Sequence, residues 1–312
     1  MRHTIPMDSS PPILFLPVFT ATAEDRTRFL DALREIGRCD TTVLTRIDPN
    51  SGEVLISGIS SDHLVATFRR ITDEYRIPCV SGEPRVRFVE TICATATGEG
   101  RHFQQTSGRG NYGHVKLRLQ PNPRGAGCDF ISEITDGRIP REFIASVEMG
   151  VREAAQAGIL AGCELVDFAA TLFDGSCHKT DSNPAAFQIA GSLALKEAAS
   201  HANPVVLEPI VSVQFVVPGM ARREMIADLQ SRRGQVTLVE RNGADSVRLW
   251  AIIPLAEILG YKPQPYVLAY LSWQQKPPRD SGGGEVNVPA PRPRGPAPKT
   301  EWSAADPDED WT

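Results

Sequence analysis

Hydrophobic positions in the first third of the chain switch between two periods, and the switch predicts the order of the elements. Residues 12–19 form an apolar run typical of a buried strand, and residues 22–37 repeat apolar side chains at helical spacing. Two short runs around a turn at 48–52 predict a hairpin, a second helical pattern begins at Ser61, and residues 84–92 predict a closing strand. The order β-α-β-β-α-β is that of a ferredoxin-like split βαβ sandwich, an α+β fold.

The same pattern returns near the other end of the chain. A strand is predicted over 207–217 and a helix over 221–232, followed by two strands joined by a tight turn and a short helical segment. Pro263 and Pro265 leave little room for a second full helix before the last strand at 266–273. This second ferredoxin-like copy is therefore predicted to be truncated.

The middle of the chain, residues 93–203, follows another plan. Residues 115–120 alternate apolar and polar as in a half-buried strand, and a helix is predicted over 140–157. A strand at 165–173 precedes a polar loop and a further helix opened by residues 182–184.

These patterns divide the chain into five parts. We expect a loose lead-in, a ferredoxin-like domain, a middle domain, a truncated ferredoxin-like domain, and a tail rich in Pro and Gly that is disordered. The predicted boundaries are 1–11, 12–91, 92–206, 207–276 and 277–312.

Composition narrows the class of protein. The chain is 41% hydrophobic and 23% charged, and no apolar run approaches the roughly 18 residues of a membrane span, so we expect no membrane partner. No secretory signal is apparent, which favours the cytoplasm. The six cysteines lack a C-x-x-C pair and the histidines lack metal-binding spacing, so we expect no metal site. Because the net charge is −5, any RNA contact must come from a local patch.

One short stretch concentrates chemistry. Residues 108–114 include three glycines together with an arginine, an asparagine, a tyrosine and a histidine. We expect this stretch to form an exposed tip between two strands. Such groups grip RNA backbones and unpaired bases, although an ordinary flexible hairpin loop explains them equally well. The stretch is Gly108, Arg109, Gly110, Asn111, Tyr112, Gly113 and His114.

Two other groups of residues allow alternative interpretations. Cys177 beside His178 suggests a thiol nucleophile, as in a small hydrolase, but neighbouring loop side chains usually diverge and no third orienting group is identifiable. Arg232 and Arg233 precede Gly234 at a predicted helix end, where they can simply complement the helix dipole.

Six motifs together resemble bacterial elongation factor G, in order and in spacing. They are residues 107–115, 139–144, 157–162, 174–178, 207–210 and 232–234. The resemblance spans about residues 12 to 275 and corresponds to the third, fourth and fifth domains of that factor. It implies two ferredoxin-like domains flanking a fourth domain with a ribosomal-protein-like βαβ fold.

The resemblance also implies partners and site residues. In the family the fourth domain enters the ribosomal decoding region and contacts the tRNA–mRNA duplex during translocation. Residues Gly110 to His114, with Arg109, would form one tip loop, and His178 and Lys179 would lie in the adjacent loop. His178 matches the histidine that is modified to diphthamide in the eukaryotic counterpart. Arg232 and Arg233 would face ribosomal RNA near the GTPase centre.

The sequence differs from the family in the motifs that bind and hydrolyse GTP. It contains no phosphate loop or guanine-recognition motif, so we expect no GTP hydrolysis and no cofactor of its own, with GTP belonging to a full-length member or a separately encoded GTPase partner. We therefore expect a cytoplasmic, non-catalytic ribosome-binding protein of translation elongation. The alternatives are a ribosomal protection or regulatory paralogue, a general binder of single-stranded RNA, and the thiol hydrolase.

Overall fold

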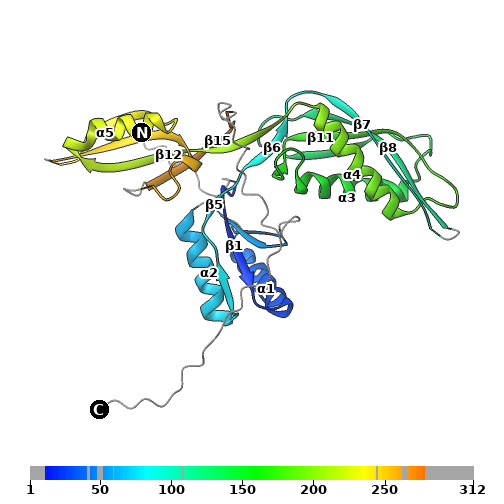
Figure 1. Cartoon of the computed structure of the whole chain (residues 1–312), viewed down its shortest axis with the longest axis horizontal. Coiled ribbons are helices and arrows are strands. Elements are labelled where there is room, and N and C mark those ends of the chain that lie inside the picture. The colour runs from blue at the N-terminus through cyan, green and yellow to red at the C-terminus, as the bar shows by residue number, and fades with distance from the viewer. Residues whose placement is uncertain are drawn as a thin grey trace, which may run out of the picture.

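Over the residues that it describes, the computed structural model is α+β, with three sheets in three lobes (Figure 1). The lead-in up to residue 10 and the tail predicted to be disordered lie outside the described residues, apart from Pro277. Within the described part, no helix is both long and apolar enough to cross a membrane. The structure describes residues 11–40, 43–47, 52–58, 60–106, 109–243, 245–261 and 266–277.

The first lobe confirms the predicted ferredoxin-like order. Its sheet runs β2-β3-β1-β4, with β5 also paired to β1, so β2 is an edge strand. Thr22 and Ser60 cap α1 and α2 by accepting hydrogen bonds from the backbone N–H three residues on, as Ser and Thr do at this position. The elements are β1 (Leu14–Thr20), α1 (Ala23–Cys39), β2 (Leu44–Ile47), β3 (Val54–Gly58), α2 (Ser61–Tyr75), β4 (Cys79–Ser81) and β5 (Arg85–Val86).

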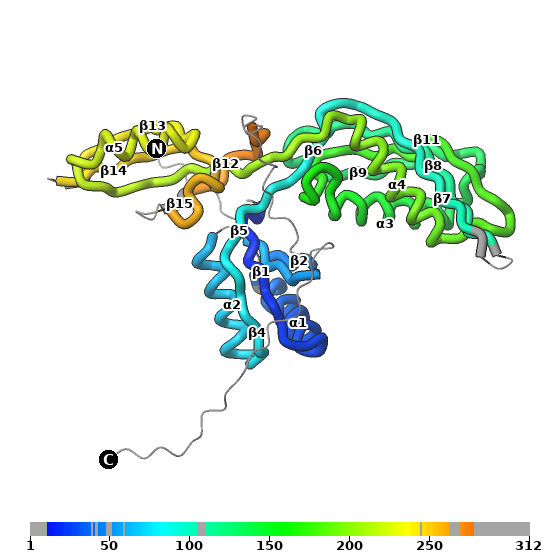
Figure 2. Tube along the Cα trace, viewed as in Figure 1, coloured from blue at the N-terminus to red at the C-terminus, as the bar shows by residue number. Residues whose placement is uncertain are grey.

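The closing strand predicted at 84–92 is divided between two sheets, which corrects the sequence prediction. Residues 85–86 complete the first sheet, whereas β6 (Val89–Ile92) pairs antiparallel with β12 (Pro204–Pro218) and parallel with β10 (Glu164–Leu165). Figure 2 follows the chain from β5 through β6 into the third lobe. The fifteen-residue β12 thereby carries one sheet from the second lobe to this junction.

The second lobe confirms the predicted strands and helix of the later module. Pro263 and Pro265, on which the predicted truncation rests, lie outside the described residues. Strand β12 pairs with both β14 and β15, and β14 pairs with β13. One turn of 3-10 helix, Leu255–Glu257, is the helical segment described between β14 and β15. The other elements are η2 (Gly219–Ala221), α5 (Arg222–Ser231), β13 (Gln235–Arg241), β14 (Ser246–Pro254) and β15 (Tyr266–Gln275).

The third lobe holds a four-stranded sheet of order β7-β8-β11-β9, with two packed helices (Figure 1). Helix α3 buries Phe143, Val147, Val151 and Ala154, the four side chains that the helical spacing predicts to face inward. The elements are β7 (Ala96–Thr106), β8 (Arg109–Pro121), β9 (Cys128–Ser132), α3 (Arg141–Ala157), β11 (Phe168–Ser176) and α4 (Pro184–His201).

Glycines bring α4 unusually close to the β7–β8 hairpin. A Cβ at Gly98, Gly100 or Gly113 would lie 2.4, 1.9 or 2.4 Å from backbone atoms of α4. The helix meets them with small side chains, Ala186, Ala190, Ala194 and Ala198, all buried. Close packing of backbone on backbone requires such small residues, so the glycines hold the hairpin rigidly against the helix.

Candidate nucleic-acid interface at the end of the third lobe

The glycine-rich stretch is the end of a strand, which corrects the prediction of a tip loop. Residues 109–121 form β8, and each residue from Arg109 to His114 lies opposite a residue of β7. Residues 107 and 108, between the two strands, and the side chain of Arg109 lie outside the described structure. Gly110, Asn111, Tyr112 and Gly113 therefore reach the end of the lobe on a paired strand.

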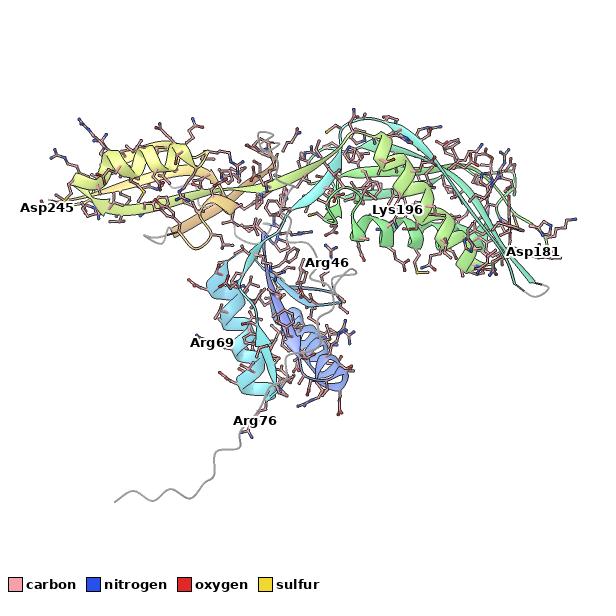
Figure 3. The ribbon with its side chains drawn as sticks, in the orientation of Figure 1. Arg46, Arg69, Arg76, Asp181, Lys196 and Asp245 are labelled. Atoms are coloured by element: carbon pink, nitrogen blue, oxygen red, sulfur yellow. The ribbon has the colours of Figure 1, made fainter. Side chains whose placement is uncertain are left out.

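The loop after β11 is fastened to this strand end. The backbone N–H of Tyr112 donates to the carbonyl of Asp181 at 2.7 Å, and Ser182 Oγ donates to the carbonyl of Tyr112 at 3.0 Å. Asn183 Nδ2 donates to Asn111 Oδ1 at 2.6 Å. The bonded residues of the two segments lie 69 to 72 positions apart in sequence, and the segments form one unit at the far end of the lobe, where Figure 3 labels Asp181.

Asp181 links the strand end to His178. Its Oδ1 accepts the backbone N–H of Gly110 at 3.3 Å, and its Oδ2 lies 3.0 Å from Nδ1 of His178. Gly110 is required for this approach, because a Cβ there would lie 2.7 Å from Cγ of Asp181. The His178 side chain is 57% exposed and meets the Tyr112 ring edge to face at 6.4 Å between centroids. An exposed imidazole is thus held in one orientation beside a half-buried phenol ring, with the exposed Lys179 next to it.

His114 lies beneath the strand end rather than on its surface. It is 8% exposed, and its ring nitrogens contact Ser176 Oγ at 2.8 Å and Glu99 Oε1 at 2.9 Å. Ser176 Oγ also contacts the Tyr112 hydroxyl at 2.7 Å. The chain Glu99–His114–Ser176–Tyr112 fixes the tyrosine, so His114 acts as a support for the interface.

Cys177 and His178 are not arranged as a catalytic thiol–imidazole dyad. Cys177 Sγ donates to the carbonyl oxygen of His178 at 3.7 Å, while Nδ1 of the His178 ring is engaged by Thr180 Oγ1 at 3.2 Å and by Asp181. Within the described ranges no group of three or more His, Cys, Asp and Glu side chains could hold a metal ion.

The two arginines of the second lobe make intramolecular contacts. Arg233 pairs with Glu208, which is 1% exposed, and with Glu257 at 2.6 Å, and these bonds raise the pKa of its guanidinium. Arg232 pairs with Asp228 at 3.2 Å and lies over the Tyr261 ring at 4.7 Å. Both arginines fasten the end of α5, and their predicted contact with ribosomal RNA remains a prediction.

Sequence reasoning missed the residues that tie the two segments together. Ser182 and Asn183 were predicted only as a helix start, and Asn183 does cap α4 by accepting from the N–H of Ala186 at 2.9 Å. The positions of Ser176 and Asp181, two and three residues from His178, were the available signal.

Comparison with known proteins identifies the three lobes. Models of elongation factor G domain III, elongation factor G domain IV and the elongation factor G C-terminus match residues 9–83, 84–203 and 205–264. The chain belongs to the elongation factor G family. Elongation factor G of Aquifex pyrophilus is 44% identical over 255 residues, which cover 80% of this chain and 36% of the relative.

A solved structure has the same fold. A crystal structure of a protein from Thermus thermophilus matches with a TM-score of 0.57 and 33% identity, over 86% of this chain and 41% of that one. The chain therefore spans well under half the length of each of these two proteins. The residues of the candidate interface all fall within the domain IV match, and Arg232 and Arg233 within the C-terminal match.

Proposed function

We propose that these domains bind the ribosome during translation elongation and contact the tRNA–mRNA duplex with the end of the third lobe. The observation that carries the proposal is the joining of β8 to the loop at 177–183 through Asp181, Ser182 and Asn183, which presents Tyr112 and His178 together. Paired rings and backbone groups on a rigid support suit recognition of nucleotides by stacking and by contact with the phosphate backbone.

The charge at this end suits a local contact. Lys179 and His178 are exposed, whereas Lys116, farther down the strand, is paired with Asp174 at 3.1 Å. Lys179 therefore places an exposed positive charge at the end of the lobe, on a chain whose net charge is −5. Such a contact positions a factor already bound by other surfaces and does not by itself supply strong affinity.

GTP hydrolysis belongs, on this proposal, to a GTP-binding domain outside the three matched domains, on the same chain or on a separately encoded partner. The matched domains act as the part that contacts RNA. In cytoplasmic translation they would then couple movement of the ribosome to hydrolysis carried out elsewhere.

Sedimentation with ribosomes at low salt tests the proposal. We expect His178→Ala and Lys179→Gln each to weaken binding about fivefold, equivalent to about 1 kcal/mol, and the loss caused by Lys179→Gln to shrink as salt rises. Lys196→Gln is the matched control, because Lys196 is exposed on α4 and lies away from Asp181 (Figure 3). Binding that is indifferent to both substitutions would contradict the proposed contact. Equal affinity for unrelated single-stranded RNA would instead identify a general RNA binder.

A further inference from the structure

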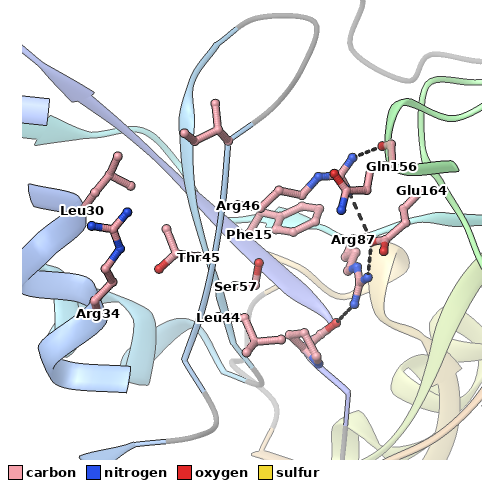
Figure 4. Close-up of a pocket in the computed structure, with 12 residues that line it drawn as sticks. Phe15, Leu30, Arg34, Leu44, Thr45, Arg46, Ser57, Arg87, Gln156 and Glu164 are labelled. Carbon is pink, nitrogen blue, oxygen red and sulfur yellow. Dashed lines mark hydrogen bonds and ion pairs between the residues drawn. The ribbon is translucent and has the colours of Figure 1, made fainter. Parts of the chain in front are cut away.

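A cavity of about 600 Å³ lies where the first lobe meets the third (Figure 4). It runs along the edge strand β2, with α1 on one side and the end of α3 on the other. Its apolar lining includes Phe15, Leu30, Leu44 and Ile47. Leu44 is 50% exposed and Ile47 is 44% exposed, so β2 presents both apolar side chains and the backbone groups of an edge strand.

The same cavity is positively charged. Arg34, Arg46 and Arg87 line it, against the single carboxylate of Glu164 among the described lining residues. Arg34 also pairs with Asp31 on α1, and both of these side chains are exposed. Glu164 lies 2.7 Å from Arg87 and 3.3 Å from Arg46, so one carboxylate is shared between two guanidinium groups. Nε of Arg87 is buried without a hydrogen-bond partner in the described structure. The lining is thus suited to an acidic ligand that also carries apolar side chains.

The chain contains a segment of matching chemistry. Residues 301–312 hold five carboxylates and two tryptophans but no arginine or lysine. The carboxylates are Glu301, Asp306, Asp308, Glu309 and Asp310, and the tryptophans are Trp302 and Trp311.

The segment can also reach the cavity. The described chain ends at Pro277, next to Lys276, whose N–H donates to the carbonyl of Val206 at 2.9 Å and whose Nζ lies 4.4 Å from the Phe88 ring centroid. Phe88 directly follows Arg87 of the cavity wall. The 35 residues from 278 to 312 can span on the order of 100 Å when extended, so length does not limit docking.

We propose that residues 301–312 dock in the cavity beside β2 of their own chain. The carboxylates of residues 306–310 pair with Arg34 and Arg46, and Trp311 packs on the apolar lining around Leu44. The segment then covers the exposed edge of β2, independently of any contact with RNA.

Photo-crosslinking in the full chain tests this docking. Trp311 is replaced by p-benzoylphenylalanine, the protein is irradiated at low micromolar concentration, and crosslinked peptides are mapped by mass spectrometry. We expect crosslinks within one chain to residues 30–47, reduced at least about fivefold by Arg34→Glu and by raised salt, since screening weakens exposed ion pairs. Arg69→Glu is the matched control, because Arg69 is an exposed arginine of α2 that does not line the cavity (Figure 3).

Three outcomes would overturn the proposal. Crosslinks scattered over all three lobes would show that the segment has no fixed site. Crosslinks to residues 30–47 that survive Arg34→Glu would show that charge does not direct it, and crosslinks only between chains would assign the contact to a second copy. Hydrogen exchange provides an independent readout: deleting residues 301–312 should speed amide exchange in Leu44–Ile47 and leave β3 unchanged, whereas equal exchange in both chains would contradict docking.

Discussion

The Glu90 carboxylate accepts a hydrogen bond from the backbone N–H of Cys163 at 3.0 Å, at the junction where β6 pairs with β10. Glu90 is fully buried, and its two carboxylate oxygens also accept the N–H groups of Ile159, Leu160 and Ala161 at 2.7, 2.9 and 2.7 Å. One side chain therefore organises the whole turn after α3. Burial, and secondarily the charge of Glu90, raise the pKa of the Cys163 thiol from its ordinary 9.0 to about 12.

The first prediction concerns the reactivity of Cys163. At pH 8 a thiol with a pKa of about 12 is ionised on the order of one part in ten thousand, so Cys163 should resist alkylation while the exposed Cys93 reacts. Because the folded-state pKa is raised, the stability that this thiol contributes is present below pH 9 and is lost as the pH rises toward 12. Iodoacetamide labelling at pH 8 with peptide mapping measures both cysteines. Labelling of Cys163 as fast as Cys93 in the folded protein would contradict the burial.

A second prediction is that Glu90→Gln loosens the turn at 158–163. Each carboxylate oxygen of Glu90 accepts hydrogen bonds from two backbone N–H groups. The side-chain NH₂ of a glutamine is a donor, so whichever oxygen it replaces, two N–H groups lose their acceptor. The loss is expected to be about 2–4 kcal/mol. Hydrogen exchange of the amides at 159–163 measures it, with Glu83→Gln, at an exposed glutamate between β4 and β5, as the control. Unchanged protection at these amides would show that the turn holds without the carboxylate.

Local patterns in the sequence predicted most elements of the fold. Helices α1 to α5 and the hairpin β13–β14 follow from helical and strand periodicity, with Thr22 and Asn183 at two of the predicted helix starts. The structure adds Ser60 as the cap of α2. The pairing of β6 with β12 did not follow, because the two strands are more than 100 residues apart and only tertiary packing brings them together.

The sequence predicted several of the residues that belong to the candidate site, but it did not predict how they are arranged. Sequence placed His114 at an exposed tip, whereas its contacts with Glu99 and Ser176 bury it, and both partners become neighbours only through strand register. Likewise the buried partner of Arg233, Glu208, lies on β12, and nothing in the local pattern around residue 233 indicates it. Register and packing across strands are the information that periodicity lacks.

The third prediction tests the glycine contacts of the third lobe. Gly100→Ala should destabilise the protein by roughly 3 kcal/mol, because the new Cβ would lie 1.9 Å from the carbonyl oxygen of Ala190 and a helix backbone cannot move aside cheaply. Gly219→Ala is the matched control, since its nearest neighbour is 3.5 Å away and its φ is not positive. Urea unfolding compares the two variants. Similar small losses for both would mean that α4 can shift away from the hairpin.

The last prediction concerns the ion pair at the end of α5. Arg233→Met leaves Glu208, 1% exposed, without its guanidinium partner, and we expect a loss of about 2–3 kcal/mol, less than for a wholly buried pair because Arg233 is 34% exposed. Adding Glu208→Gln removes the unpaired charge, so the double variant should recover about 1 kcal/mol relative to Arg233→Met alone.

Urea unfolding of the four proteins in this cycle measures the coupling, with Arg223→Met, at an exposed arginine of the same helix, as the control. Additive losses would show that Arg233 does not stabilise the fold through Glu208. Such a result would leave its guanidinium available to an outside partner, and ribosome binding by Arg233→Met would then distinguish a contact with RNA from a structural bond. If the coupling is present, the same substitution should weaken ribosome binding only as far as it unfolds the second lobe.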